Sequence, residues 1–238
     1  MPLGSDNGWS MVARTYLIDK LITAQIAEGI EMVVNLAAGL DTRPYRMELP
    51  PSLQWIEIDL PEILDYKEEL LRDEKPVCSL ERIRLDLSNA TARLQLLEAL
   101  GRQAKKVLAI TEGLIIYLDR EQVANLAWDL AAPPSFCSWI AEVASPGLLK
   151  MLDKKMKLEL KTTAPFKFAP EEGTQFFEPF GWEATENHSL LKTAGKLHRL
   201  PLYLKLISLM PEKPGPQGPR PWSGVCLFRK KSPAIPID

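Results

Sequence analysis

The chain has 238 residues, of which 46% are hydrophobic and 25% charged, as expected for one globular domain with a substantial core. Its 29 Lys and Arg against 31 Asp and Glu give a net charge of −2, which argues against a nucleic acid or membrane partner attracted by overall charge. The three cysteines form no C-x-x-C pair, which argues against a zinc knuckle or a redox motif. The first residues do not show a basic flank followed by an apolar run, the pattern of a signal peptide. We therefore expect a cytoplasmic protein without a membrane span.

The N-terminal half alternates helical patterns with short apolar runs. A helix is predicted over residues 10–28, where apolar side chains recur at helical spacing. Further helices are predicted over 61–71, near 88–99, and over 119–131 and 146–160. The apolar runs that precede or separate them are predicted strands at 32–36, 55–58, 83–85, 107–110 and 135–141. This alternation indicates an α/β fold with a doubly wound, mostly parallel sheet.

The pattern changes after Gly181. Residues 182–185 are predicted as a late strand, 190–210 as helical segments and 224–228 as a final strand. Five prolines between 211 and 221 predict a connecting loop that cannot be helical. No internal repeat or second domain boundary is visible, so we predict a single domain over residues 1–238.

Acids and one glycine follow successive predicted strands. They are Gly39, Asp41, Asp59, Asp86 and Glu112. Open parallel sheets bind ligands beyond the carboxyl ends of their strands, so these residues have the strongest claim to function. A glycine turn after the first strand and an acid about 20 residues later is a nucleotide-binding arrangement, in which the acid accepts hydrogen bonds from ribose hydroxyls.

The first turn argues against a dinucleotide. Residues 37–42 lack the second and third glycines of the pyrophosphate fingerprint, and Asp41 lies where a phosphate would be repelled. Four acids at strand ends suit a ligand with ribose, adenine and positive charge but no phosphate. S-adenosylmethionine, which carries a sulfonium and an ammonium group, meets that description.

Four motifs resemble the leucine carboxyl methyltransferase family, including its bacterial polyketide O-methyltransferase-like members. The motifs are VVNLAAGLDTRPYR at 33–46, WIEIDLP at 55–61, the pair Asp86-Leu87, and TEGLIIYL at 111–118. The resemblance covers roughly residues 10–145. It implies a class I S-adenosylmethionine-dependent methyltransferase with a Rossmann-like sheet of seven strands, of which the final one is antiparallel.

The resemblance also implies roles for individual residues. Arg14 resembles the arginine that holds the carboxylate of the cofactor, and Asp86 with Leu87 resembles the pair that contacts adenine. The expected cofactor-binding residues are Arg14, Gly39, Asp41, Asp59, Asp86, Leu87 and Glu112. Tyr117 and Arg43 are candidates for positioning substrate, and no metal site is expected. In this reading residues 1–28 are an N-terminal helical segment, 29–145 the cofactor-binding half, and 146–238 the substrate-side and C-terminal half.

Several of these residues have structural alternatives. Asp59 or Asp86 could instead cap the helix that follows it. Arg14 could pair with an acid on its own helix, and Arg43 could pair with surface acids. Glu112 lies between apolar residues and would be buried at a high cost unless it meets a cation.

The hypothesis is in-line methyl transfer to a carboxylate or hydroxyl of a small, polyketide-like acceptor. A carboxylate needs no general base, whereas a hydroxyl does, and the sequence offers no clear candidate. A catalytically degenerate binding module and a nucleotide-dependent oxidoreductase are the alternatives. The acceptor itself does not carry over, because this chain is short where the family forms its acceptor pocket.

Overall fold

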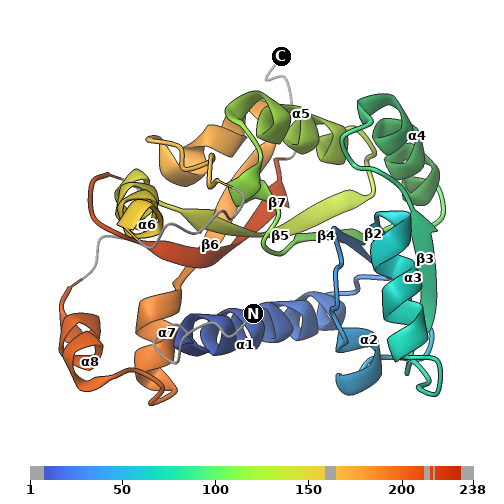
Figure 1. Cartoon of the computed structure of the whole chain (residues 1–238). Helices are drawn as coiled ribbons and strands as arrows, with labels where there is room; N and C mark the ends of the chain where they lie inside the picture. The colour runs from blue at the N-terminus through green and yellow to red at the C-terminus, as the bar shows by residue number, and fades with distance from the viewer. Residues whose placement is uncertain (1–7, 159–164, 212–214, 217, 232–238) are drawn as a thin grey trace.

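A computed structural model describes residues 8–158, 165–211, 215–216 and 218–231 (Figure 1). Its strands are β1 (Met32–Leu36), β2 (Gln54–Asp59), β3 (Ser79–Arg84), β4 (Val107–Thr111), β5 (Phe136–Ala144), β6 (Trp182–Ser189) and β7 (Ser223–Lys230). Its α-helices are α1 (Gly8–Ala27), α2 (Arg43–Arg46), α3 (Pro61–Leu70), α4 (Ala90–Gly101), α5 (Arg120–Ala131), α6 (Pro146–Leu158), α7 (Leu190–Lys196) and α8 (Leu202–Leu209). Two 3-10 helices are η1 (Ile115–Tyr117) and η2 (Gly173–Phe180).

All seven strands form one sheet in the order β3-β2-β1-β4-β5-β7-β6. The five strands from β3 to β5 are parallel, and β7 runs antiparallel to both β5 and β6. The predicted fold class is confirmed, including the antiparallel final strand. The strand order reverses between β1 and β4, so the carboxyl ends of these neighbours flank the position where open sheets bind ligands.

The central strands are buried because helices cover both faces of the sheet (Figure 1). All five residues of β1 are buried, and so are all five of β4. Val34 of β1 and Ala109 of β4 pack into one core with α4, α5 and η2. Val33 and Leu108, the neighbouring residues, pack into the opposite core with α1 and α7. The alternation of side chains along a strand therefore fills two cores from one short apolar run.

Three strands differ from the predicted bounds by three or more residues at one end. The third lies over Ser79–Arg84 rather than 83–85, because β3 is an edge strand whose side chains alternate in exposure instead of forming a buried run. The fifth continues past Glu142 to Ala144, since β7 pairs along its whole end. The sixth continues to Ser189 because pairing with β7 extends it into polar sequence.

The predicted start of α5 is confirmed. Asp119 accepts a hydrogen bond from the backbone of Gln122, whose side chain bonds back to the backbone of Asp119, which completes a capping box. The helix predicted near 88–99 begins at Ala90, after Asn89 as its cap.

Among the described residues no helix combines the length and apolar character required to span a membrane.

Candidate functional site

Two pockets meet at the carboxyl ends of the parallel strands. The first, about 310 Å³, lies between the ends of β2 and β3 and helix α5, and most of its wall is apolar. The second, about 420 Å³, lies between α1 and the loop after β1 and contains several charged side chains. Ala37, the residue that follows β1, lines both. An elongated ligand with an apolar end and a charged end would therefore pass over the turn after β1.

That turn has a strained backbone. Ala37 has φ +56° and Gly39 has φ +49°, both in the left-handed region that costs a residue with a Cβ about 1–2 kcal/mol. A Cβ built on Gly39 would meet no protein atom within 4 Å, so only the pocket lies in front of this backbone. The sequence reasoning identified Gly39 but not Ala37, because nothing local marks an alanine as left-handed.

Asp59 fixes this turn from the end of β2. Its Oδ2 accepts a hydrogen bond from the backbone N–H of Gly39 (2.7 Å), and its Oδ1 accepts one from Leu60 (2.8 Å). Helix α3 has no side-chain cap, so the capping alternative for Asp59 is wrong. A carboxylate offers about four acceptor positions, and two remain for a ligand in the first pocket.

Asp86 and Leu87 border the same pocket after β3. Asp86 accepts a hydrogen bond from the backbone N–H of Ser88 (2.9 Å), which lowers the pKa of this exposed carboxyl. Asn89 caps α4, so the capping alternative for Asp86 is also wrong. Arg93 donates to the carbonyl of Leu87 (2.6 Å) and pairs with Asp129, which holds the loop in place.

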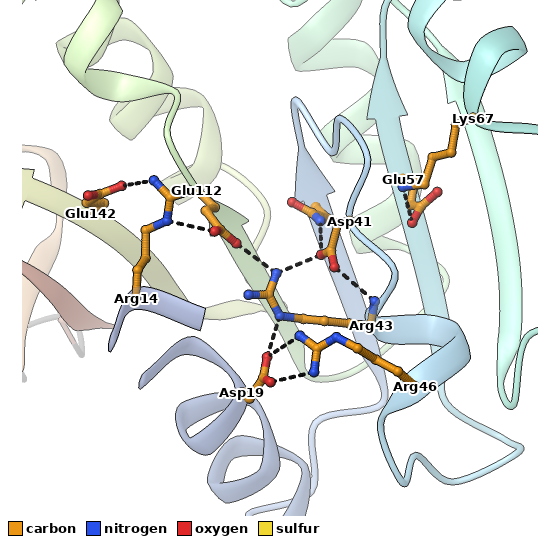
Figure 2. Close-up of polar contacts among 10 residues, drawn as sticks. Arg14, Asp19, Asp41, Arg43, Arg46, Glu57, Lys67, Glu112 and Glu142 are labelled. Carbon is orange, nitrogen blue, oxygen red and sulfur yellow. Dashed lines mark hydrogen bonds and ion pairs between the residues drawn. The ribbon is translucent and has the colours of Figure 1, made fainter. Parts of the chain in front are cut away.

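The second pocket is built around a network of charges, here called the cleft network (Figure 2). Its members are Arg14, Asp19, Asp41, Arg43, Arg46, Glu112 and Glu142. Three arginines face four carboxylates, so the network has one excess negative charge when all groups are ionised. A cation in the second pocket would be attracted by it.

Arg43 is the buried centre of the cleft network. Only 2% of its side chain is exposed, and it bonds Asp19 (2.6 Å), Asp41 (2.8 Å) and Glu112 (2.8 Å). Asp41 also accepts from Asn35 (2.8 Å) and from the backbone of Arg43 (2.9 Å). These contacts give Arg43 and Asp41 protein partners, and both residues also line the second pocket.

Arg14 of α1 reaches the strand ends from the other side. Its Nε lies 2.8 Å from Glu112 and its Nη1 lies 2.9 Å from Glu142. Glu112 thus meets the cation that its position requires. The alternative of a pair within α1 is wrong, because Asp19 bonds Arg43 and Arg46 instead.

Glu142 was missed by the sequence reasoning. It lies inside β5 rather than after it, and burial of its carboxyl, with the charge of Glu112 nearby, raises its pKa despite the opposing effect of Arg14. Tyr117, a candidate for positioning substrate, is 42% exposed, and its ring packs at a tilt against Phe166 with 5.4 Å between the ring centroids. It lines neither of the two pockets.

Comparisons with known proteins place this geometry in context. The family model "Leucine carboxyl methyltransferase" matches residues 6–131. A Frankia alni protein named "Putative S-adenosyl-L-methionine-dependent methyltransferase" is 36% identical over 118 residues, which cover 49% of this chain and 41% of that protein. A Streptomyces avermitilis protein of the same description is 29% identical over 193 residues, covering 80% and 68%. The chain therefore matches less than half the length of the Frankia relative.

Solved structures share the fold at low sequence identity. A DUF574 family protein from Streptomyces avermitilis superimposes with a TM-score of 0.62 at 14% identity, covering 92% of this chain and 83% of that one. The magnesium protoporphyrin IX methyltransferase from Synechocystis, solved with bound SAH, gives a TM-score of 0.53 at 11% identity, covering 92% and 84%. Similarity at this level extends to the fold of the sheet and its helices.

Proposed function

This chain belongs to the leucine carboxyl methyltransferase family, and from that premise we propose that it is an S-adenosylmethionine-dependent methyltransferase. One observation carries the proposal: an apolar pocket and a charged pocket join at Ala37, with Asp59 beside the junction. From the first pocket to the second, the apolar wall suits an adenine, Asp59 suits a ribose, and the charged side chains suit an amino acid group. The left-handed turn and the open space before Gly39 leave room for such a ligand against the backbone.

The residues divide between the two pockets. Asp59 would accept hydrogen bonds from the ribose hydroxyls, while Leu87 and Leu126 provide apolar walls for the base. Arg14 would hold the carboxylate of the cofactor. Glu112 touches both Arg14 and Arg43, so it links this contact to the buried centre of the cleft network. Asp86, an exposed residue that lines the first pocket, would lie beside the base.

Methyl transfer depends more on the alignment of cofactor and acceptor than on proton transfer. The cofactor supplies a methyl group already activated by its sulfonium charge. The protein contributes a fixed orientation and a set of charges that are paired before the ligand arrives, so little reorganisation is needed. Burial of Arg43 among three carboxylates keeps the charges at the strand ends in place.

We further propose an oxygen acceptor on a small, polyketide-like molecule. The proposal rests on the family resemblance of the strand-end motifs. A carboxylate acceptor is already ionised at neutral pH and needs no base. Transfer to such an acceptor requires only that it approach the methyl group in line.

Two assays test the proposal in sequence. Calorimetric titration with S-adenosylhomocysteine and separately with NAD comes first, and we expect binding of the former alone. Binding of NAD alone would indicate the oxidoreductase. Methyl transfer to a panel of carboxylates and phenols then follows, and cofactor binding without any turnover on that panel would favour a binding module.

A further inference from the structure

Helix α8 exposes an apolar surface, here called the α8 face. It consists of Leu202, Tyr203, Leu206, Ile207, Leu209 and Met210, each between 48% and 76% exposed. Isolated exposed apolar residues are normal, but five on one short helix and a sixth at its C-cap form a patch of the kind that marks an interaction site.

The α8 face points away from the rest of the protein. Ser208 is the buried residue of α8, and a Cβ on Gly195 of α7 would lie only 2.7 Å from its Oγ, so the two helices touch there. Residues three and four apart share one side of a helix, and the apolar side chains occupy the sides not used by Ser208. A helix at a protein surface normally has the opposite arrangement.

The same segment has a strong local charge. Between Glu186 and Glu212 the sequence contains four Lys or Arg residues, Lys192, Lys196, Arg199 and Lys205, and no acid. None of the four forms an ion pair with an acid in the described part of the chain. Lys192 donates to the carbonyl of Met210, which ties α7 to the end of α8. A charge of +4 is thus concentrated in a chain with a net charge of −2.

We propose that the α8 face docks on the surface of an anionic lipid bilayer. The apolar side chains would insert at the level of the headgroups, and the basic side chains would contact the negative charges. No membrane partner was expected from the sequence because the net charge of the chain is close to zero. That net charge hides the basic segment, because acids elsewhere in the chain offset it. Figure 1 shows α8 at one end of the molecule, where it can approach a flat surface.

Charge and shape favour this occupant over two others. A second copy related by a two-fold axis would bring two patches of +4 together, and like charges repel. A rigid protein partner would have to supply a groove for a convex helix, whereas a lipid surface adapts to its shape. One short helix with four basic residues predicts reversible binding that weakens with salt.

Vesicle sedimentation tests the proposal with the whole protein. We expect binding to phosphatidylcholine vesicles that contain about 30 mol% phosphatidylglycerol, and weak binding to phosphatidylcholine alone. Lys196→Gln and Lys205→Gln should each weaken binding by about fivefold. The double variant Leu202→Asp, Leu206→Asp should lose binding. Leu70→Asp, at an exposed position of α3 far from α8, should retain it.

Several results would overturn the proposal. They are the absence of binding to anionic vesicles at low salt, equal binding to neutral vesicles, and retention of binding by the Leu202 and Leu206 double variant. Sedimentation velocity without vesicles tests the second-copy alternative, and a dimer that Leu206→Asp dissociates would replace the lipid surface with that partner. Circular dichroism of each variant shows whether its fold is intact. Because none of these readouts uses the cofactor, the outcome is independent of the proposed function.

Discussion

The chain has two groups of ion pairs, each with a buried charged residue at its centre, and they lie in different places. The cleft network gathers at the carboxyl ends of the strands and borders a pocket. The second group, here called the Glu57 cluster, lies between β2, β3 and helix α3, where Lys67 and Arg82 contact the fully buried carboxylate of Glu57 at 2.8 and 2.9 Å. Figure 2 shows Glu57 and Lys67 apart from the network. We propose that the position along the strand, rather than the residue type, decides whether a charged group binds the cofactor or supports the fold.

A second difference lies in the balance of charge. Glu57 is enclosed by two cations, and Arg82 also donates to the hydroxyl of Tyr45 (2.7 Å), so the cluster satisfies its carboxylate internally. The cleft network has one more carboxylate than arginines. We therefore expect changes in the Glu57 cluster to affect stability, and changes at the strand ends to affect cofactor binding.

The largest effect is expected for Lys67→Met. Removal of one partner from a buried ion pair leaves Glu57 partly uncompensated and should lower the free energy of unfolding by about 3–5 kcal/mol. Arg72→Met is the control, since its contact with Asp73 is exposed and should contribute less than about 1 kcal/mol. Urea unfolding measures both. If Lys67→Met unfolds like the parent but binds S-adenosylhomocysteine more weakly, the division between the two groups is wrong.

Asp59→Ala should weaken cofactor binding more than it lowers stability. The loss of hydrogen bonds to a charged group should weaken binding of S-adenosylhomocysteine by about 1.5–3 kcal/mol, with a smaller change in stability. Asp65→Ala removes an exposed acid from α3 and should leave the dissociation constant unchanged. Isothermal titration compares the two variants. An unchanged constant for Asp59→Ala would remove this residue from the site.

Gly39→Val, compared with Gly29→Val, distinguishes backbone strain from the blocking of the cofactor pocket. At φ +49° a β-branched residue should lower stability by about 1–3 kcal/mol, and its side chain would occupy ligand space and abolish binding. Gly29→Val places the same residue at φ +94° in the turn between α1 and β1, at the opposite end of this strand from Gly39. We expect both variants to melt earlier and only the Gly39 variant to lose binding. Equal binding by both would place the cofactor elsewhere.

The smallest effect concerns Glu142 and pH. Because burial raises the pKa of its carboxyl above the ordinary 4.5, the folded state holds this proton more tightly than the unfolded state. The stability of the parent should therefore fall, relative to Glu142→Gln, as the pH rises from about 4.5 through the folded pKa, and the difference should then level off. Unfolding curves for both proteins between about pH 4 and pH 8 give this difference. A difference that increases with pH would mean that Arg14 lowers the pKa.

The sequence predicted the elements whose signals are local. Strand β1 was placed correctly because both of its faces are buried and four of the five residues in the run Met32–Leu36 are apolar. The edge strand β3 was misplaced because its residues alternate between solvent and core. The strand-end acids were identified because parallel topology brings them to one edge.

The contacts made by those acids could not be predicted. Arg43 finds Asp19 24 residues away and Glu112 69 residues away, and these partners depend on how α1 packs against the strand ends. The fifth strand was predicted to stop at residue 141, before Glu142, because the antiparallel pairing that carries it further comes from β7, far along the chain. The exposed apolar side of α8 could not be predicted either, because an apolar helical pattern predicts a buried face.

A crystal structure of the protein with S-adenosylhomocysteine tests the central claim most directly. The account predicts one ligand that spans both pockets across Ala37, with its ribose hydroxyls on Asp59 and its carboxylate at Arg14. The base should lie against Leu87 in the first pocket. A ligand bound away from the turn after β1, or one confined to a single pocket without contact to Asp59, would contradict the account.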